Sequence, residues 1–333
     1  MPISVSNWGE KAGARILALA LSAIAACGLS ATAAHAEWPE RTVTMIVPYA
    51  AGGNTDVMAR IAAEEFQKAF GQSFIIENVL GAGGAVAAQR VARSAPDGYT
   101  LMFASTAQFA VAPVMQKVTY DPLKDFVPIA VFGSSFSVLA VNGSLPVKTL
   151  PEFVDYAKKH PGKLNYGSGG VGTIGHLTTA AFAKRAGIEL VHVPYRGGAQ
   201  ATSDLLSGQV NVYFGNSIEL LPHQNGDKIK LLAVATDKRV SQAPDLPTVS
   251  EFYPNFYMPS WNGLLAPANT PAKITDALAA RLKTMLSRKE NIARLLELGV
   301  VAGGPSGEEF RKYMVEEQAT FAKVITETGL SGN

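Results

Sequence analysis

The sequence contains almost no cysteine: Cys27 is the only one in 333 residues. One thiol cannot form an internal disulfide, and it cannot build the thiolate clusters of zinc or iron–sulfur sites. The five histidines are scattered along the chain, so their spacing predicts no metal site either. We therefore expect neither a bound metal nor a cofactor.

A strong excess of either charge is also missing. Lys and Arg together number 29 and Asp and Glu 27, which gives a formal net charge of +2. Proteins that bind nucleic acid usually carry a larger basic surface than this. We therefore expect no nucleic-acid partner, and the chain length suits two lobes of ordinary domain size.

The N-terminal segment has the pattern of a secretory signal peptide. Lys11 and Arg15 precede an apolar run at residues 16–26, and a small-residue site, Ala-His-Ala, follows at residues 34–36. The run is shorter than the roughly 20 helical residues that span a bilayer. We predict a signal peptide at residues 1–36 and export to the periplasm. Lipid anchoring through Cys27 is the less favoured interpretation of the same segment.

Short strand-like runs alternate with helical patterns along the rest of the chain, which is typical of an α/β protein with largely parallel sheets. Strands are predicted at residues 42–48, 73–78, 100–104, 127–132, 137–141, 164–166, 190–194, 210–214, 230–235 and 263–266. Helices are predicted at residues 55–70, 84–94, 150–160, 174–187, 199–207, 271–286, 290–298 and 307–328.

Two stretches rich in Pro, Asn, Gly and Ser, residues 142–150 and 241–262, interrupt this alternation. If the chain leaves one lobe at the first stretch and returns at the second, the region between them forms an inserted lobe. We therefore predict that residues 37–141 and 259–333 form lobe 1 and residues 142–258 form lobe 2, with a cleft between the lobes.

Three glycine-rich turns, each between a predicted strand and a predicted helix, are the most informative segments. They span residues 48–56, 166–177 and 194–200. Glycine allows a ligand to approach the backbone closely, and the free N–H groups at a helix N-terminus bind anions. The predicted ligand contacts in these turns are Tyr49, Ala51, Gly52, Gly53, Asn54, Asp56, Ser168, Gly172, Thr173, His176, Arg196 and Gly197. Ser105, Thr106 and Asn216, which follow strand ends, complete the set.

Some of these side chains also have a structural interpretation. Asp56 can serve as a capping carboxylate in the first turn of its helix, where it matches the helix dipole. His176 can have a structural role near its helix start. Arg196 can pair with a ligand carboxylate or remain a solvated surface residue.

Two enzyme interpretations fit parts of the second turn. Its glycines match GxGxxG, but Glu189 lies at the wrong end of the following strand for a dinucleotide fingerprint. Ser168, His176 and Asp204 occur in an order that a serine hydrolase could use. The nucleophile elbow GxSxG is absent, however, because Tyr166 stands at its first glycine position. A serine hydrolase therefore stays a remote alternative.

Many short motifs follow one another along the chain: IVPYAAGGNTD at residues 46–56, GAGG at 81–84, PDGYTL at 96–101, PGKLNYGS at 161–168, HVPY at 192–195, DLLSGQV at 204–210, LPTV at 246–249 and WNGLLAP at 261–267. This pattern resembles the Bug family of extracytoplasmic receptors, the substrate-binding components of tripartite tricarboxylate transporters. Arg196 and Gln200 depart from the lysine and proline that are common in the family, and side chains that rim the cleft set the ligand specificity.

The resemblance implies a type II periplasmic binding fold, in which two lobes close over a ligand. It also implies that backbone amides and waters of the loops at residues 49–56 and 168–173 hold the ligand's carboxylate, and that a membrane permease is the partner. We therefore expect a monomeric, non-catalytic receptor for a di- or tricarboxylate, an aromatic acid or an acidic amino acid. A ligand sensor for a membrane signalling partner is the alternative.

Overall fold

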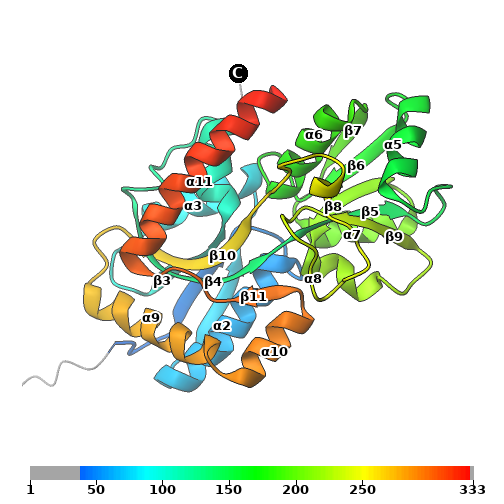
Figure 1. Cartoon of the computed structure of the whole chain (residues 1–333). Coiled ribbons are helices and arrows are strands. Elements are labelled where there is room, and N and C mark those ends of the chain that lie inside the picture. Colours follow the sequence, from blue (N-terminus) through cyan, green and yellow to red (C-terminus); the bar gives the residue numbers. More distant parts are fainter. Residues whose placement is uncertain (1–37, 331–333) are drawn as a thin grey trace, which may run out of the picture. The chain divides into compact units, whose positions relative to one another are not determined.

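The computed structural model describes residues 38–330, so the predicted signal peptide and Cys27 lie outside the described residues. From Arg41 onward the described chain is one compact unit that contains two β-sheets (Figure 1). The protein is α/β, with two lobes that are each built around one sheet.

The first sheet has six strands in the order β11-β4-β10-β3-β1-β2, and helices lie on both of its faces (Figure 1). Its strands are β1 (Val43–Val47), β2 (Phe74–Asn78), β3 (Thr100–Ser105), β4 (Phe126–Ser135), β10 (Ser260–Pro267) and β11 (Val300–Ala302). Its helices are α2 (Asn54–Phe70), η1 (Ala82–Gly84), α3 (Ala85–Ala92), η2 (Ala107–Val111), α4 (Ala112–Met115), α9 (Ala272–Leu286), α10 (Lys289–Glu297) and α11 (Gly307–Thr328).

The second sheet has five strands in the order β7-β6-β8-β5-β9. Its strands are β5 (Ser137–Asn142), β6 (Leu164–Ser168), β7 (Leu190–Pro194), β8 (Val212–Asn216) and β9 (Ile229–Val234). The helices of this part of the chain are α5 (Leu150–Lys159), α6 (Ile174–Ala186), α7 (Gly198–Ser207), α8 (Ser217–Leu220), η3 (Leu221–His223) and η4 (Val249–Glu251).

The prediction of largely parallel sheets is wrong, because both sheets are mixed. β1, β2 and β3 run parallel, whereas β10 pairs antiparallel with both β3 and β4. In the second sheet β6 runs parallel to β7 and β8, and β5 pairs antiparallel with β8 and β9. The antiparallel pairs arise where the chain passes between the sheets, because β4 continues into β5 and the returning β10 lies beside β4.

The passage from the first sheet to the second occurs at Phe136, between β4 and β5. It lies a few residues before the stretch at 142–150 where the sequence suggested it. The return falls between β9 and β10, within residues 235–259. The residue bounds predicted for the two lobes stay a prediction, although β5 pairs with strands of the second sheet along its whole length.

The C-terminal helix α11 connects the packing of the two sheets. Near its start, Phe310 packs edge-on against the buried ring of Trp261 in β10, with ring centroids 4.8 Å apart. Farther along, Phe321 and Ile325 belong to the apolar cluster that also contains Phe182 of α6. One helix therefore contributes apolar side chains to the cores of both lobes.

Glu317 is a buried carboxylate on this connecting helix. We predict that it makes the free energy of unfolding of the protein depend on pH. Burial raises its pKa from 4.5 to about 7, and a hydrogen bond from the Trp261 indole N–H offsets this only in part. Between these two pH values the folded state binds more protons than the unfolded state, so the free energy of unfolding falls as pH rises. This carboxylate should remove about 3 kcal/mol over that window.

Glu317→Gln should abolish this component while keeping a side-chain oxygen for the indole. The free energy of unfolding of the variant, relative to that of the unaltered protein, should increase as pH rises. Chemical unfolding at several pH values measures this difference. Glu316→Gln, at an exposed neighbouring position, is the control. Parallel stability curves for the Glu317→Gln variant and the unaltered protein would contradict the prediction.

Candidate functional site

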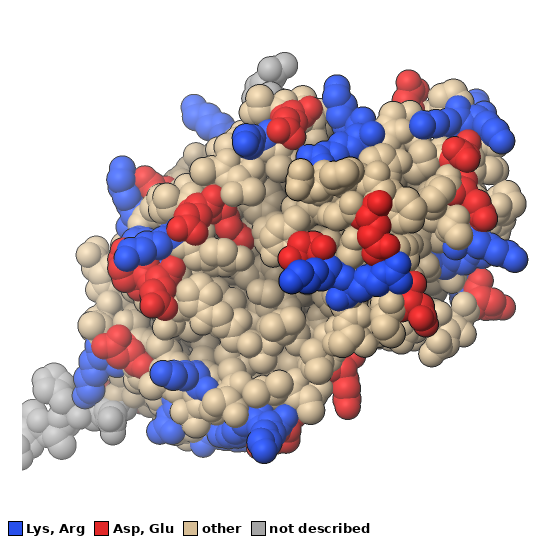
Figure 2. All heavy atoms as spheres, viewed as in Figure 1, with Lys and Arg blue, Asp and Glu red and all other residues tan. Residues whose placement is uncertain are grey.

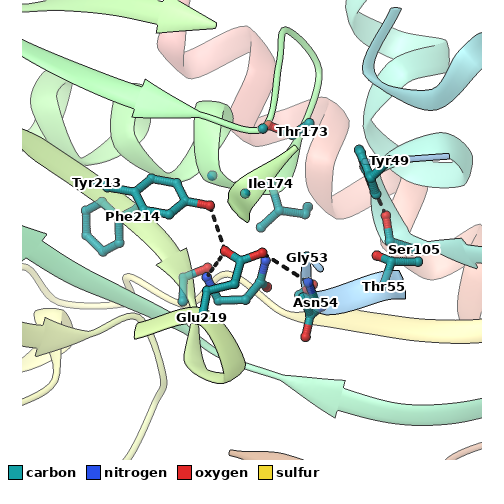
Figure 3. A pocket seen from close by; sticks show the side chains of 16 residues that line it. Tyr49, Gly53, Asn54, Thr55, Ser105, Thr173, Ile174, Tyr213, Phe214 and Glu219 are labelled. Atoms are coloured by element: carbon teal, nitrogen blue, oxygen red, sulfur yellow. Dashed lines mark hydrogen bonds between the residues drawn. The ribbon is translucent and has the colours of Figure 1, made fainter. Parts of the chain in front are cut away.

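A cavity of about 50 Å³ lies between residues of the two lobes (Figure 3). Most of its lining residues are small or uncharged, and several come from the starts of helices. The lining consists of Tyr49, Gly53, Asn54, Thr55, Ser105, Ser137, Gly169, Thr173, Ile174, Gly175, Gly198, Tyr213, Phe214, Asn216, Glu219 and Ser260.

Residues of all three glycine-rich turns line this cavity. Gly53 precedes the first residue of α2, Thr173 is the N-cap of α6, and Gly198 is the first residue of α7. A helix start exposes N–H groups that have no intrahelical acceptor, and its dipole favours negative charge. The cavity wall therefore combines three helix ends that each attract an anion.

The start of α6 offers its donors most directly. Ile174 and Gly175, both in the first turn, line the cavity. The side chain of Thr173 donates to the carbonyl of Gly170 at 2.7 Å and accepts from the amide of His176 at 3.4 Å. These bonds fix the turn, so the first-turn amides are held in place before any ligand arrives.

On the opposite wall, Tyr49 provides a fixed phenol. Its oxygen accepts a hydrogen bond from the Gln108 side chain at 2.7 Å and lies 3.3 Å from the Ser105 hydroxyl. Burial raises the pKa of Tyr49, although the hydrogen bonds of Ser105 and Gln108 act in the opposite direction. The phenol therefore keeps its proton at neutral pH and can act as a neutral hydrogen-bond donor.

A buried pair of asparagines sets the position of the α2 start. The Asn54 side-chain amide donates to Oδ1 of Asn262 at 2.8 Å. Asn262 in turn donates from Nδ2 to the Thr55 hydroxyl at 2.8 Å and to the Ala104 carbonyl at 3.2 Å. Both asparagines are at most 5% exposed, so every one of these polar groups depends on its protein partner.

Glu219 reaches into the cavity from α8. One carboxylate oxygen accepts from the backbone amide of Asn54, in the other lobe, at 3.1 Å (Figure 3). The other oxygen accepts from the Tyr213 hydroxyl at 2.8 Å and from the Asn216 amide at 3.4 Å. Burial raises the pKa of this carboxyl, and these hydrogen bonds lower it in part. The sequence prediction missed Glu219.

Asp56 does not line the cavity, and the structure gives it the structural role considered above. It accepts from the Gly52 amide at 3.0 Å, from the Arg60 guanidinium at 2.8 Å and from the Asn78 side chain at 2.9 Å. Burial would raise the pKa of Asp56, but the hydrogen bonds from these three partners outweigh it and keep the pKa below its ordinary value. Asp56 thus stabilises the first turn through hydrogen bonds on the side away from the cavity.

Ser168 and His176 lie behind the second turn rather than on its surface. The Ser168 hydroxyl is 2.7 Å from Nε2 of His192, and the rings of His192 and His176 stack with centroids 4.2 Å apart. Burial, with a smaller contribution from His192, lowers the pKa of His176 to about 4. Both Ser168 and His176 are at most 5% exposed. The stacked side chains support the loop as neutral groups.

This arrangement does not assemble the serine hydrolase that the sequence left open. Ser168 contacts His192 instead of His176, and Asp204 accepts a hydrogen bond from the Tyr195 hydroxyl at 2.6 Å. The three residues named for that reaction therefore have different partners, and the hydroxyl is buried away from the cavity.

Other predicted contacts lie beside the cavity rather than on its wall. Ala51, Gly52 and Arg196 are exposed, and the Arg196 carbonyl accepts from the Ala50 amide at 3.2 Å. Thr106 is fully buried, and its hydroxyl accepts from the Trp261 amide at 2.9 Å. Gly172 and Gly197 are buried outside the lining set. The predicted residues that the structure does bring to the wall are Tyr49, Gly53, Asn54, Ser105, Thr173 and Asn216.

The sequence reasoning missed ten lining residues. They are Thr55, Ser137, Gly169, Ile174, Gly175, Gly198, Tyr213, Phe214, Glu219 and Ser260. Five of them, Thr55, Gly169, Ile174, Gly175 and Gly198, lie inside the glycine-rich turns, so the turns themselves were the usable signal. Ser137, Tyr213 and Ser260 could not be found in this way, because they lie far apart in the sequence and only the folded sheets bring them to the cavity.

The face of the molecule seen in Figure 2 has mixed charge. Figure 2 shows basic and acidic side chains interspersed over the face in view. Among residues 38–330, no group of three or more His, Cys, Asp or Glu side chains is placed to hold a metal ion. The helices in this part of the chain are all too short or too polar to span a bilayer.

Comparison with known proteins identifies relatives along nearly the whole chain. Residues 58–330 match the family described as "Tripartite tricarboxylate transporter family receptor". Protein BugT of Bordetella pertussis is 32% identical over 318 residues, which cover 95% of this chain and 98% of BugT.

Solved structures of similar proteins have the same fold. A Rhodopseudomonas palustris protein, Rpa4515 with adipate, is 34% identical, with a TM-score of 0.87 over 89% of this chain and 100% of that one. MatC from the same species, with bound malate, is 33% identical, with a TM-score of 0.83 over 86% of this chain and 100% of that one. The periplasmic binding protein BugD is 31% identical, with a TM-score of 0.85 over 89% of this chain and 100% of BugD. The chain belongs to the Bug family of tripartite tricarboxylate transporter receptors.

Proposed function

We propose that this receptor captures a small carboxylate in the cavity between its lobes. The observation that carries the proposal is the meeting of three helix starts, those of α2, α6 and α7, at one cavity. A single helix end favours a carboxylate by only about 0.3–1 kcal/mol, so useful affinity needs several donors and a closed environment. The amides of Ile174 and Gly175 and the phenol of Tyr49 are the donors that we expect the ligand to use.

The candidate ligands are di- or tricarboxylates, aromatic acids and acidic amino acids. Adipate and malate, bound in the two R. palustris relatives, are small dicarboxylates and support this range. We further propose that the receptor acts in the periplasm, reached through the signal peptide at residues 1–36, and that the lobes open and close by a hinge to deliver the ligand to the membrane subunits of a tripartite transporter.

Thermal unfolding of the purified protein against a panel of ligands tests the proposal. The panel holds mono-, di- and tricarboxylates, aromatic acids, amino acids and neutral sugars. A ligand at 100 times its dissociation constant should add about 2.7 kcal/mol to the free energy of unfolding. We expect stabilisation by a class of carboxylate and not by the neutral sugars, because helix-start amides favour an anion that can accept several hydrogen bonds.

The neutral sugars are the control for nonspecific stabilisation, because they offer hydroxyl groups but no charge. Stabilisation by sugars alone would overturn the proposal. Stabilisation by a carboxylate that persists when Thr173 and Tyr49 are replaced together by Val and Phe would show that the acid binds elsewhere.

A further inference from the structure

Glu219 is the only acidic or basic residue among the described residues that line the cavity. It stands in the cavity that is proposed to bind a carboxylate, and the cavity wall holds no lysine, arginine or histidine from the described chain. A ligand that offered only carboxylates would therefore place like charges within a few ångströms of each other in a partly dry site, which is strongly unfavourable.

The hydrogen bonds of Glu219 leave its charge uncompensated. Its partners are two backbone amides, of Asn54 and Asn216, and the hydroxyl of Tyr213, all of which are neutral donors. None of the ion pairs in the described part of the chain includes this carboxylate. A buried carboxylate is ordinarily paired with a cation, so the local structure lacks a partner that a ligand can supply.

The surrounding residues make room for this carboxylate. A Cβ atom at position 198 would lie 2.1 Å from Oε1 and 2.3 Å from Oε2 of Glu219, so only glycine at the start of α7 permits the observed position. The carboxylate also stays partly open to the cavity between Tyr213, Phe214 and Asn54 (Figure 3). Aromatic rings are favourable neighbours for a cation, because their faces carry partial negative charge.

We infer that the ligand carries a positively charged nitrogen in addition to its carboxylate, and that Glu219 binds this nitrogen. The inference rests on the proposed function, because the ligand's carboxylate is still held by the helix-start amides. The ligand is then an amino carboxylate, such as an amino acid or another zwitterion. The ammonium neutralises Glu219, while the carboxylate takes the donors at the start of α6.

A capping role alone is the competing explanation for Glu219. The carboxylate does accept from the Asn216 amide at the start of α8, but that bond is long, at 3.4 Å, and α8 has only four residues. The shorter bonds go to Asn54, in the other lobe, and to Tyr213. A residue that only capped α8 would affect stability without changing which ligands bind.

Binding measurements with ligand pairs that differ only in an amino group test the inference. Suitable pairs are succinate with aspartate, glutarate with glutamate, and butyrate with γ-aminobutyrate, titrated calorimetrically near neutral pH into protein freed of bound ligand. For at least one pair, the amino member should bind at least about tenfold more tightly, because a charge-assisted hydrogen bond replaces a repulsion.

Glu219→Gln is the decisive variant, because glutamine keeps the size of the side chain and an oxygen for the Asn54 amide. It should lose the preference for the amino member and gain affinity for the plain acid. Glu290→Gln, at an exposed position, is the matched control and should keep the preference. Thermal unfolding of both variants checks that they are folded.

Two outcomes would overturn the inference in different ways. If the plain acids bind the unaltered protein as tightly as their amino partners, or if the Glu219→Gln variant keeps the preference, Glu219 does not bind a cationic nitrogen, although carboxylate capture stands. If no carboxylate of any pair binds the unaltered protein, the proposed function fails, and this inference fails with it.

Discussion

Replacing Gly83 with alanine should weaken ligand binding by roughly ten- to hundredfold while leaving both lobes folded. Gly83 lies in η1, beside the six-stranded sheet, and faces the loop before α6. A Cβ atom there would lie 2.3 Å from the carbonyl oxygen of Val171. Since that atom belongs to the backbone, it cannot turn aside as a flexible side chain would, and the lobes should be held apart.

The control for this variant is Gly187→Ala. Gly83 and Gly187 have nearly the same left-handed backbone, with φ of +62° and +64°, so alanine introduces the same conformational strain at both. Nothing lies within 4 Å of the Cβ position at Gly187. Any difference between the two variants therefore reports the contact with Val171.

Calorimetric affinity and small-angle X-ray scattering, with and without ligand, measure the effect. The Gly83→Ala variant should stay expanded when ligand is added, because the closed state that binds the ligand has been made less favourable. Equal affinities for the two alanine variants would show that approach of the Gly83 and Val171 segments is not required for binding.

The parts of the site that could be predicted from the sequence are local in the chain. A strand, two or more glycines and a helix start lie within about ten residues of each other, and each of the three turns has this form. Their geometry is fixed by neighbouring residues, so Gly53, Asn54 and Thr173, which line the cavity, could be selected from the sequence. The same locality made the long helices and the longer strands predictable.

Contacts between distant segments were not predictable in this way. Glu219 meets the Asn54 amide across a separation of 165 positions, and it stands on a helix of four residues that has no periodic pattern. β11 has only three residues and acquires its strand geometry from pairing with β4. Such elements are defined by their tertiary partners, because their own sequence is too short to show a period.

Arg196 shows what a local pattern leaves undetermined. It was the one cation near the turns, and its position before Gly197 suggested contact with a carboxylate. In the structure the turn uses the backbone of Arg196, whose carbonyl accepts from Ala50, while its side chain is exposed. The sequence pattern could not tell the direction of this flexible side chain.

Asn262→Asp should lower the free energy of unfolding by about 3–5 kcal/mol near neutral pH. The side-chain amide of Asn262 donates to the Thr55 hydroxyl and the Ala104 carbonyl, and an ionised aspartate has no proton for either. The new charge would be fully buried, because position 262 has 0% exposure. It would also face the Ala104 carbonyl oxygen, which repels it.

Chemical unfolding measures this loss, with Asn225→Asp as the control because it makes the same chemical change at an exposed position. Acid should restore part of the stability of the Asn262→Asp variant relative to the control, since a protonated aspartate is neutral and can donate one hydrogen bond. The loss in free energy of unfolding could instead stay the same from neutral pH down to about pH 4, which is near the ordinary pKa of an aspartate. This result would show that the missing hydrogen-bond donors, rather than the charge, are responsible. A loss below about 1 kcal/mol would contradict the prediction itself.

In either charged or neutral form the Asn262→Asp variant loosens the start of α2, so its ligand affinity should fall together with its stability. This separates Asn262 from Glu219, because replacing Glu219 should change only the choice of ligand.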